Sequence, residues 1–248
     1  MAIDRRSLII GSASGAGLLS IGIAGLGAQI LDGQKPAPVI TDSAFPKLPI
    51  GMNLAGIADW EPGFPFRNLF WGARPWQTRN LSGSGPQNTK THDAFQFDDD
   101  GYPLQVPVAA PGQTEPQTVF TYVPNCRKPG IYTLLYDGEG EIDGLASTKI
   151  IARKPGRVKF RMAHVQGQYE AIVIKRSKLG NHVRNIRLVA EADENVDLAA
   201  EPFLPEFLDF CRPFHCLRFM DWAQINNSTD EHWAGRKRPT FYTMVGVP

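Results

Sequence analysis

The sequence lacks the features that mark a protein stabilised by disulfides or by structural zinc. It holds only 3 cysteines in 248 residues, and an odd number leaves at least one thiol free. No Cys-x-x-Cys or His-x-x-x-His pair occurs, and the 5 histidines are scattered, so we expect no metal site and no cofactor. Cys211 and Cys216 are near enough in sequence to form a bridge, but we favour buried free thiols for the cysteines.

The chain also lacks an excess of charge, internal repeats and, beyond its amino terminus, long apolar runs. A formal net charge of +1 gives no reason to expect nucleic acid or an anionic membrane as a partner. No stretch after residue 31 approaches the roughly 20 apolar residues that a membrane-spanning helix needs. The length of 248 residues and the hydrophobic content of 42% allow one large domain or two modest ones.

Residues 1–34 are predicted to be an export signal of the twin-arginine type. Arg5 and Arg6 precede an apolar segment rich in glycine and alanine, residues 8–31. A permanent amino-terminal membrane anchor is the alternative. Residues 35–47 contain three prolines and are predicted to form an extended linker. We therefore expect a protein exported to the periplasm or outside the cell, which touches the membrane only through an uncleaved signal.

Residues 48–192 are predicted to form a β-sandwich of the jelly-roll type. The 20 prolines and 24 glycines are spread along the chain and mark many turns. Residues 157–162 alternate apolar with basic side chains, which indicates a strand with one buried face. Residues 169–174 are apolar on both faces, as in a central strand. We expect strands over residues 50–54, 104–108, 118–123, 131–137, 147–153, 157–162, 169–175 and 184–190, and a loop over 79–95.

Residues 98–101, with the sequence Asp-Asp-Asp-Gly, invite comparison with a calcium-binding loop. They lack the alternating ligand spacing of that loop, so we expect a turn rich in carboxylates.

Residues 193–248 are predicted to be a short α/β segment that is similar to the start of a TIM barrel. A helix is expected over residues 205–211, with Phe207, Leu208 and Phe210 directed toward a core. A strand over residues 215–222 then ends in a carboxylate and an indole, Asp221 and Trp222. Barrels of this kind keep their site residues at the carboxyl ends of their strands.

Aromatic and polar side chains in two regions are candidates for carbohydrate binding. Most of the rings in residues 60–76 are expected to fill core, and one or two are expected to be exposed as platforms for sugar rings. Nearby charged side chains would then orient the ligand. Glycoside hydrolysis needs two carboxyl groups, and Asp221 has no evident partner, so we predict no catalytic residue. The candidates are Asp59, Trp60, Trp71, Arg74, Trp76, Asp221, Trp222, Asn226, Trp233 and Arg236.

Five short motifs stand out: residues 51–54 with Asp59 and Trp60, 130–132, 136–140, 185–187, and above all 217–222 with Trp233 and Arg236. Together they resemble a family of large secreted bacterial proteins described as cellulose-binding or glycoside-hydrolase-like. The resemblance implies a β-sandwich followed by a TIM-barrel domain, with residues 217–222 similar to its opening strand. Family members continue well past the equivalent of Pro248, and a full barrel takes about 250 residues. No catalytic pair is carried over.

We therefore predict an exported carbohydrate-binding protein that is non-catalytic as the chain stands and whose partner is a polysaccharide or an oligosaccharide. One alternative is the amino-terminal part of a glycoside hydrolase with an incomplete TIM barrel. Another is an envelope protein that uses the sandwich face to bind a protein partner.

Overall fold

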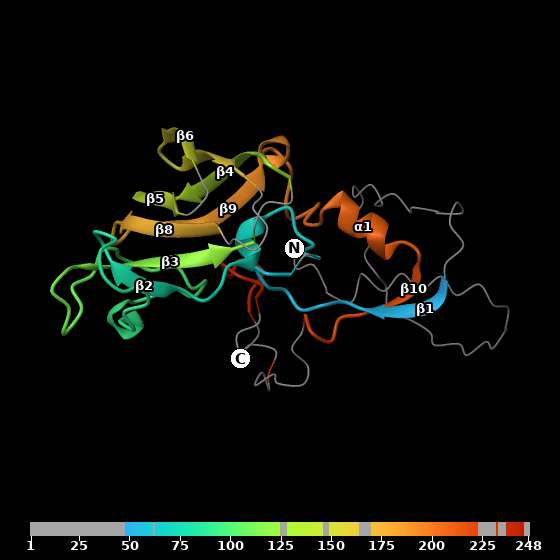
Figure 1. Cartoon of the computed structure of the whole chain (residues 1–248), viewed down its shortest axis with the longest axis horizontal. Helices are drawn as coiled ribbons and strands as arrows, with labels where there is room; N and C mark the ends of the chain where they lie inside the picture. The colour runs from blue at the N-terminus through green and yellow to red at the C-terminus, as the bar shows by residue number, and fades with distance from the viewer. Residues whose placement is uncertain are drawn as a thin grey trace, which may run out of the picture.

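The fold is mainly β and is described by a computed structural model that covers residues 48–61, 63–124, 128–145, 149–163, 170–222, 232 and 237–245. Figure 1 shows the antiparallel sheets at one end of the molecule, and a helix with a pair of strands at the other. The predicted export signal and linker, residues 1–47, lie outside the described residues. So do Cys126, Asn226, Trp233 and Arg236.

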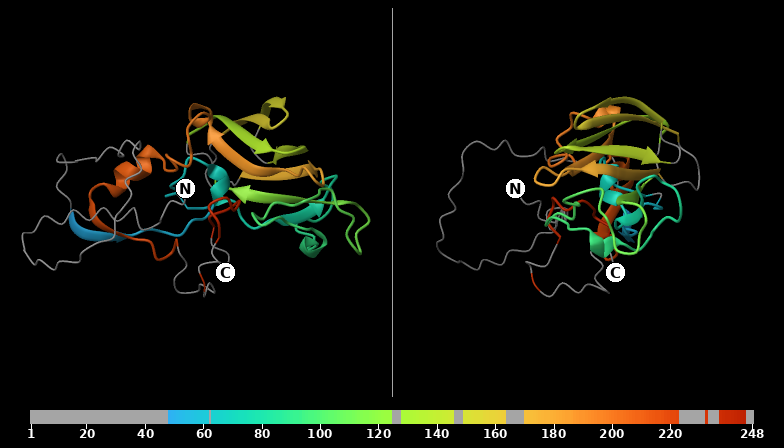
Figure 2. Two further views of the ribbon diagram at one scale, coloured as in Figure 1. Left: turned by 180° about the vertical axis from the view of Figure 1, so that it is seen from behind. Right: turned by 90° about the vertical axis from the view of Figure 1, so that its left-hand side faces the viewer.

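Two antiparallel sheets share one hydrophobic core, an arrangement compatible with a β-sandwich (Figure 2). Within the described residues, each sheet is four-stranded, with the orders β2-β3-β8-β5 and β6-β7-β4-β9. Apolar side chains from both sheets meet in the core, among them Ile172 and Ile174 from one sheet and Leu134, Phe160 and Leu188 from the other. The strands are β2 (Gln77–Asn80), β3 (Gln117–Val123), β4 (Gly130–Asp137), β5 (Gly140–Leu145), β6 (Lys149–Lys154), β7 (Arg157–Met162), β8 (Glu170–Ser177) and β9 (Arg184–Ala190).

The strand pairs are nested along the chain. β6 and β7 pair with each other as neighbours in sequence. The strands on either side of them, β5 and β8, pair in the first sheet, and the next two outward, β4 and β9, pair in the second. A long antiparallel ribbon is thus folded back and forth between the two sheets.

The clearest sequence patterns are confirmed. In β7 the apolar residues Val158, Phe160 and Met162 are buried, while Arg161 is exposed. β8 lies between β3 and β5, as its continuous apolar run indicates.

Three expectations about strands differ from the structure. The predicted loop over residues 79–95 is wrong at its start, because β2 pairs with β3. The predicted strand over 104–108 is not formed; Val106 and Val108 make only isolated bridges, to Ser177 and Gln117. β5 was not expected, since two glycines and two acidic residues interrupt its apolar pattern.

β9 is an edge strand, and side chains satisfy two of its backbone N–H groups. The hydroxyl oxygen of Tyr102 accepts a hydrogen bond from the N–H of Ile186 at 3.1 Å, and Asn68 Oδ1 accepts from Leu188 at 2.9 Å. Asn68 Oδ1 also accepts from Phe70 and so caps the 3₁₀ helix η2 (Leu69–Gly72). Both side chains are buried. Asn68 and Tyr102 therefore fasten the loop segments that carry them to the edge of the second sheet.

A parallel pair of strands, β1 (Leu48–Asn53) and β10 (Phe214–Arg218), forms a separate sheet. The helix α1 (Pro205–Cys211) precedes β10. The expected strand over 50–54 and the expected helix are confirmed, whereas the expected strand over 215–222 ends earlier. β1 lies outside the sandwich predicted for residues 48–192, because its backbone hydrogen bonds go to β10. The sandwich strands are therefore inserted between two neighbouring parallel strands.

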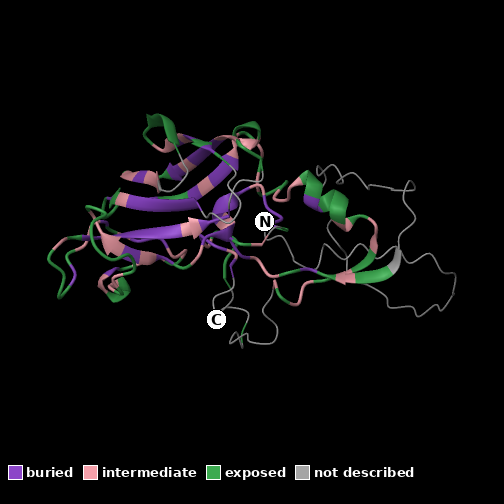
Figure 3. Cartoon of the chain, viewed as in Figure 1, coloured by how far each residue is buried: buried purple, intermediate pink, exposed green. Residues whose placement is uncertain are grey.

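The helix α1 buries less apolar surface than expected. Phe207 is 6% exposed, but Leu208 and Phe210 are 43% and 51% exposed, so the prediction that all three face a core is wrong (Figure 3). At 3.6 residues per turn, Leu208 and Phe210 lie on opposite sides of Phe207 around the helix, and only the narrow face that bears Phe207 is covered. Cys211 is half-buried and Cys216 exposed, and both are free thiols, so burial of Cys216 was also wrongly expected. In the described part of the chain no helix has the length and apolar character to cross a membrane.

The 3₁₀ helix η4 (Glu191–Asp193) ends at Glu194, which ties it to the outer face of the second sheet. Arg157 donates two hydrogen bonds to the carboxylate of Glu194, at 2.6 Å and 2.8 Å, and Thr133 donates a third at 3.1 Å. The bonds from Arg157 hold the pKa of the Glu194 carboxyl below its usual value.

This lowered pKa makes the contribution of Glu194 to stability depend on pH. Because the folded state favours the charged form, the contribution is present above the ordinary glutamate pKa of about 4.3 and is lost as the pH falls through the lowered folded value. We expect Glu194→Gln to be less stable than the wild type at pH 7, and the gap to shrink steadily between about pH 5 and pH 3. Urea denaturation of both proteins across this range measures the gap. A gap that does not change with pH would contradict the expectation.

Candidate functional site

The carboxyl ends of β1 and β10 bring together residues that lie far apart in the sequence. Asn53, the last residue of β1, donates a hydrogen bond from Nδ2 to Oδ2 of Asp221 at 3.1 Å, across 168 residues of chain. Gly56 lies beside Asp221, since a Cβ on it would be 3.7 Å from the Cβ of Asp221. Asp221 itself is exposed. It is therefore presented at the edge where parallel strands commonly position ligand contacts.

Asp59 and Arg74 form an ion pair a few residues beyond this edge. The Nε of Arg74 donates to Oδ1 of Asp59 at 2.7 Å. The Asp59 side chain is fully buried, while 27% of the Arg74 side chain is exposed. Among the described residues, the second oxygen of Asp59, Oδ2, has no hydrogen-bond partner. Since buried carboxylate oxygens normally have a donor, Asp59 can accept one further hydrogen bond.

The guanidinium of Arg74 lies against two aromatic rings. Its Cζ is 5.2 Å from the centre of the Trp60 ring and 5.0 Å from that of Tyr122, both within cation–π range. The backbone of Arg74 is fixed to β3 by hydrogen bonds from Arg74 N to Tyr122 O and from Thr121 Oγ1 to Arg74 O. Trp60 nevertheless remains 58% exposed. The indole of Trp60 is therefore a flat surface open to solvent. It is supported by Arg74, whose backbone is held by β3.

The other predicted aromatic candidates do not share this position. Trp76 is only 5% exposed, stacks on Tyr242 at 5.2 Å and donates from Nε1 to the carbonyl oxygen of Gly101 at 2.8 Å. It belongs to the core, so the expectation that it contacts a ligand is wrong.

Trp71 and Trp222 are half-buried in an aromatic cluster that joins the sandwich to α1 and β10. Phe66 lies between them, with ring centres at 5.2 Å from Trp71 and 5.7 Å from Trp222. Trp222 also stacks on Phe207 of α1 at 5.8 Å. These two indoles connect parts of the protein and offer less free surface than Trp60.

The sequence reasoning missed two residues that support the site. Asn53 orients Asp221, and the ring of Tyr122 packs against the Arg74 guanidinium. No sequence signal singles out Tyr122; the structure shows it as the one partly exposed position of β3, whose other residues are buried.

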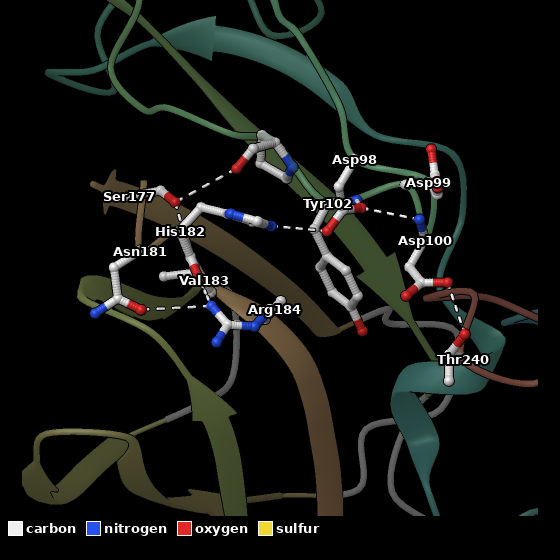
Figure 4. Close-up of polar contacts among 12 residues, drawn as sticks. Asp98, Asp99, Asp100, Tyr102, Ser177, Asn181, His182, Val183, Arg184 and Thr240 are labelled. Carbon is white, nitrogen blue, oxygen red and sulfur yellow. Dashed lines mark hydrogen bonds and ion pairs between the residues drawn. The ribbon is translucent and has the colours of Figure 1, made fainter. Parts of the chain in front are cut away.

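A second group of polar side chains lies near the turn between β8 and β9 (Figure 4). His182 Nε2 is 2.7 Å from Asp98 Oδ2, and Asp98 Oδ1 accepts hydrogen bonds from the backbone N–H groups of Asp100 and Tyr102. Ser177 Oγ accepts from the N–H of Val183 at 2.9 Å. These bonds close a carboxylate-rich turn, as expected, and hold it against the sheet. Within the described residues no group of three or more His, Cys, Asp or Glu side chains could hold a metal ion.

The arrangement around Trp60 can bind a ring that is apolar on its face and polar at its rim. The indole provides the apolar surface, and the partly exposed Arg74, held by the buried Asp59, provides charge and hydrogen-bond donors beside it. Comparison of the chain with protein-family models, with curated proteins and with solved structures gave no match.

Proposed function

We propose that this chain is an exported carbohydrate-binding protein and that Trp60 is the platform on which a sugar ring stacks. The single observation that carries the proposal is the 58% exposed indole of Trp60, supported by the Arg74 guanidinium, which in turn pairs with a buried carboxylate. An indole offers a broad, rigid apolar face, which suits the C–H face of a sugar. A few fixed polar groups beside such a face supply orientation.

The polar groups have separate roles in this proposal. Asp59, whose side chain is fully buried, acts by holding Arg74, and Arg74 in turn supports the ring of Trp60. Asp221, held by Asn53, contacts the part of the ligand that extends over the ends of β1 and β10. The sequence candidates Asn226, Trp233 and Arg236 belong to the same proposal and lie outside the described residues.

A pull-down with insoluble polysaccharides tests the role of Trp60. We expect Trp60→Ala to weaken binding by about 5- to 150-fold, because truncating a dominant aromatic contact costs roughly 1–3 kcal/mol. Phe210→Ala is the matched control, since Phe210 is a comparably exposed aromatic residue on α1. Unchanged binding by Trp60→Ala, or an equal loss in both variants, would contradict the proposal.

Export is the second part of the proposal. It rests on Arg5 and Arg6 before the apolar segment 8–31 and implies a periplasmic or extracellular location. Cell fractionation tests it: the chain is expected outside the cytoplasm, and a wholly cytoplasmic protein would contradict it.

The fold supports a more detailed architecture and a second candidate function. The nested pairs β6–β7, β5–β8 and β4–β9 favour a jelly roll, in which an antiparallel ribbon is rolled into two sheets.

The parallel pair β1–β10, with α1 before β10, favours the beginning of an α/β barrel in which β1 comes before β10. The second candidate is therefore the amino-terminal part of a glycoside hydrolase. Release of reducing ends from a bound polysaccharide would favour it over a binding protein.

A further inference from the structure

The hairpin of β6 and β7 carries charge of one sign only. Residues 149–162 contain six basic residues and no acidic residue, although the whole chain has a formal net charge of only +1. β6 is exposed along its whole length (Figure 3).

The strand register gathers five of these cations on the outer face of the second sheet. Val158, Phe160 and Met162 point into the core, so the residues that alternate with them point outward. Lys149 lies opposite Arg161, and Lys154 lies opposite Arg157. Opposite positions share a face. The outer face therefore bears Lys149, Lys154, Arg157, Lys159 and Arg161.

Among the described residues, acidic side chains neutralise only two of the five cations. Arg157 pairs with Glu194, and Lys159 pairs with Glu191. The other three, Lys149, Lys154 and Arg161, are exposed and have no ion pair with any described residue. Lys149 and Arg161 also face each other directly, and like charges at opposite positions repel. An anion bound between them would remove this repulsion.

Protection of the sheet edge explains only part of this pattern. Lysines on an edge strand such as β6 discourage pairing with other chains. Arg161, however, lies on β7, which is flanked by β6 and β4, so its charge protects no edge. Ile150 lies opposite the buried Phe160 and so shares its face, whereas Ile151, 42% exposed at the irregularity in β6, adds apolar surface to the hairpin. Charge together with apolar surface is typical of a binding face.

We propose that the outer face of the β6–β7 hairpin binds an acidic polysaccharide, a linear chain bearing carboxylate, sulfate or phosphate groups. The proposal rests on the carbohydrate-binding function above but places the acidic chain on a different surface from Trp60. Side chains on one face of a strand repeat about every 7 Å, and neighbouring strands lie about 4.8 Å apart. The cations thus form a grid that can follow a regularly charged polymer. The one aromatic ring of the hairpin, Phe160, is buried, so the face offers no ring for stacking nucleic-acid bases.

Binding of the full chain to polygalacturonate, a carboxylated polysaccharide, tests the proposal. We expect the wild type to bind with an affinity that falls at least tenfold between about 50 and 300 mM salt, since the contacts are ionic. Lys149→Glu/Arg161→Glu is expected to lose at least tenfold in affinity, and Lys149→Gln/Arg161→Gln about three- to tenfold. The milder pair covers the case in which charge reversal impairs folding, and thermal unfolding checks both variants. Arg176→Glu/Arg184→Glu is the control, because it reverses two exposed charges outside the hairpin and should bind like the wild type.

Three results would overturn the proposal: wild-type affinity in both hairpin variants, an equal loss in the control, or binding to anionic vesicles or single-stranded DNA but not to polygalacturonate. Failure of the Trp60 proposal is distinguishable from each of these. It would appear as unchanged binding of Trp60→Ala to neutral polysaccharide, whereas the hairpin variants are expected to keep their binding to neutral polysaccharide.

Discussion

Arg74→Met is expected to lower the free energy of unfolding by about 3–5 kcal/mol, because it leaves a buried carboxylate without its partner. The Asp59 side chain is fully buried, and its Oδ1 lies 2.7 Å from Arg74 Nε. Methionine preserves most of the length of the arginine side chain, so the loss reports the charge and its hydrogen bond. The hydrogen bond from Thr121 Oγ1 uses the carbonyl of Arg74 and survives the change. Urea denaturation with an unchanged m-value measures the loss.

A second variant separates the buried charge from simple loss of packing. Asp59→Asn/Arg74→Met is expected to recover at least half of the lost stability, because a neutral amide needs no counter-charge. Lys178→Met is the matched control: it breaks an exposed pair with Glu139, in which both side chains are more than half exposed, and should cost about 0–1 kcal/mol. A loss in Arg74→Met no larger than that in the control would show that the Asp59–Arg74 pair does not support the site.

Trp222→Ala is expected to speed tryptic cleavage after Arg218 by about 30-fold; Arg212 is not a site, because Pro213 follows it. The ring of Trp222 lies 5.7 Å from that of Phe66 and 5.8 Å from that of Phe207, and so links the sandwich to α1. Truncating a fully buried tryptophan costs about 3–5 kcal/mol; for this half-buried one we expect about 2 kcal/mol. A seven-residue helix and a two-stranded sheet are not stable by themselves, so local opening exposes the cleavage site after Arg218.

Trp60→Ala is the control for this experiment, since it removes an indole that lies outside the aromatic cluster. It should be cut after Arg218 at the wild-type rate, and the sandwich fragment should persist in all three proteins. Equal cleavage of Trp222→Ala and the wild type would contradict the proposed link between α1 and the sandwich.

Much of the sandwich could be predicted because its signals are local. The alternation in β7 marks its buried face, and the turn at Pro155 and Gly156 marks its start. β5 has no such pattern: Gly140, Glu141, Asp143 and Gly144 leave little apolar signal, and its place is set by pairing with β8. The pairing of β1 with β10 is equally invisible in the sequence, because the whole sandwich lies between them.

The candidate site could be predicted only by residue type. Trp60 and Trp76 lie in the same aromatic stretch, yet one is exposed and the other is covered by Tyr242 from the far end of the chain. The contact between Asn53 and Asp221 likewise depends on strands that meet only in the folded protein. Side-chain chemistry indicated which groups could bind a sugar, and tertiary packing decided which of them are accessible.

The most direct test of sugar stacking on Trp60 is the indole N–H spectrum of the protein labelled with ¹⁵N at its 5 tryptophans. The Trp60 signal is assigned by its absence in Trp60→Ala, and an oligosaccharide from the polysaccharide captured in the pull-down is then titrated in. We predict that the Trp60 signal shifts and saturates with the ligand, while the signal of the buried Trp76 stays in place. Saturated binding with an unmoved Trp60 signal would contradict the proposed site.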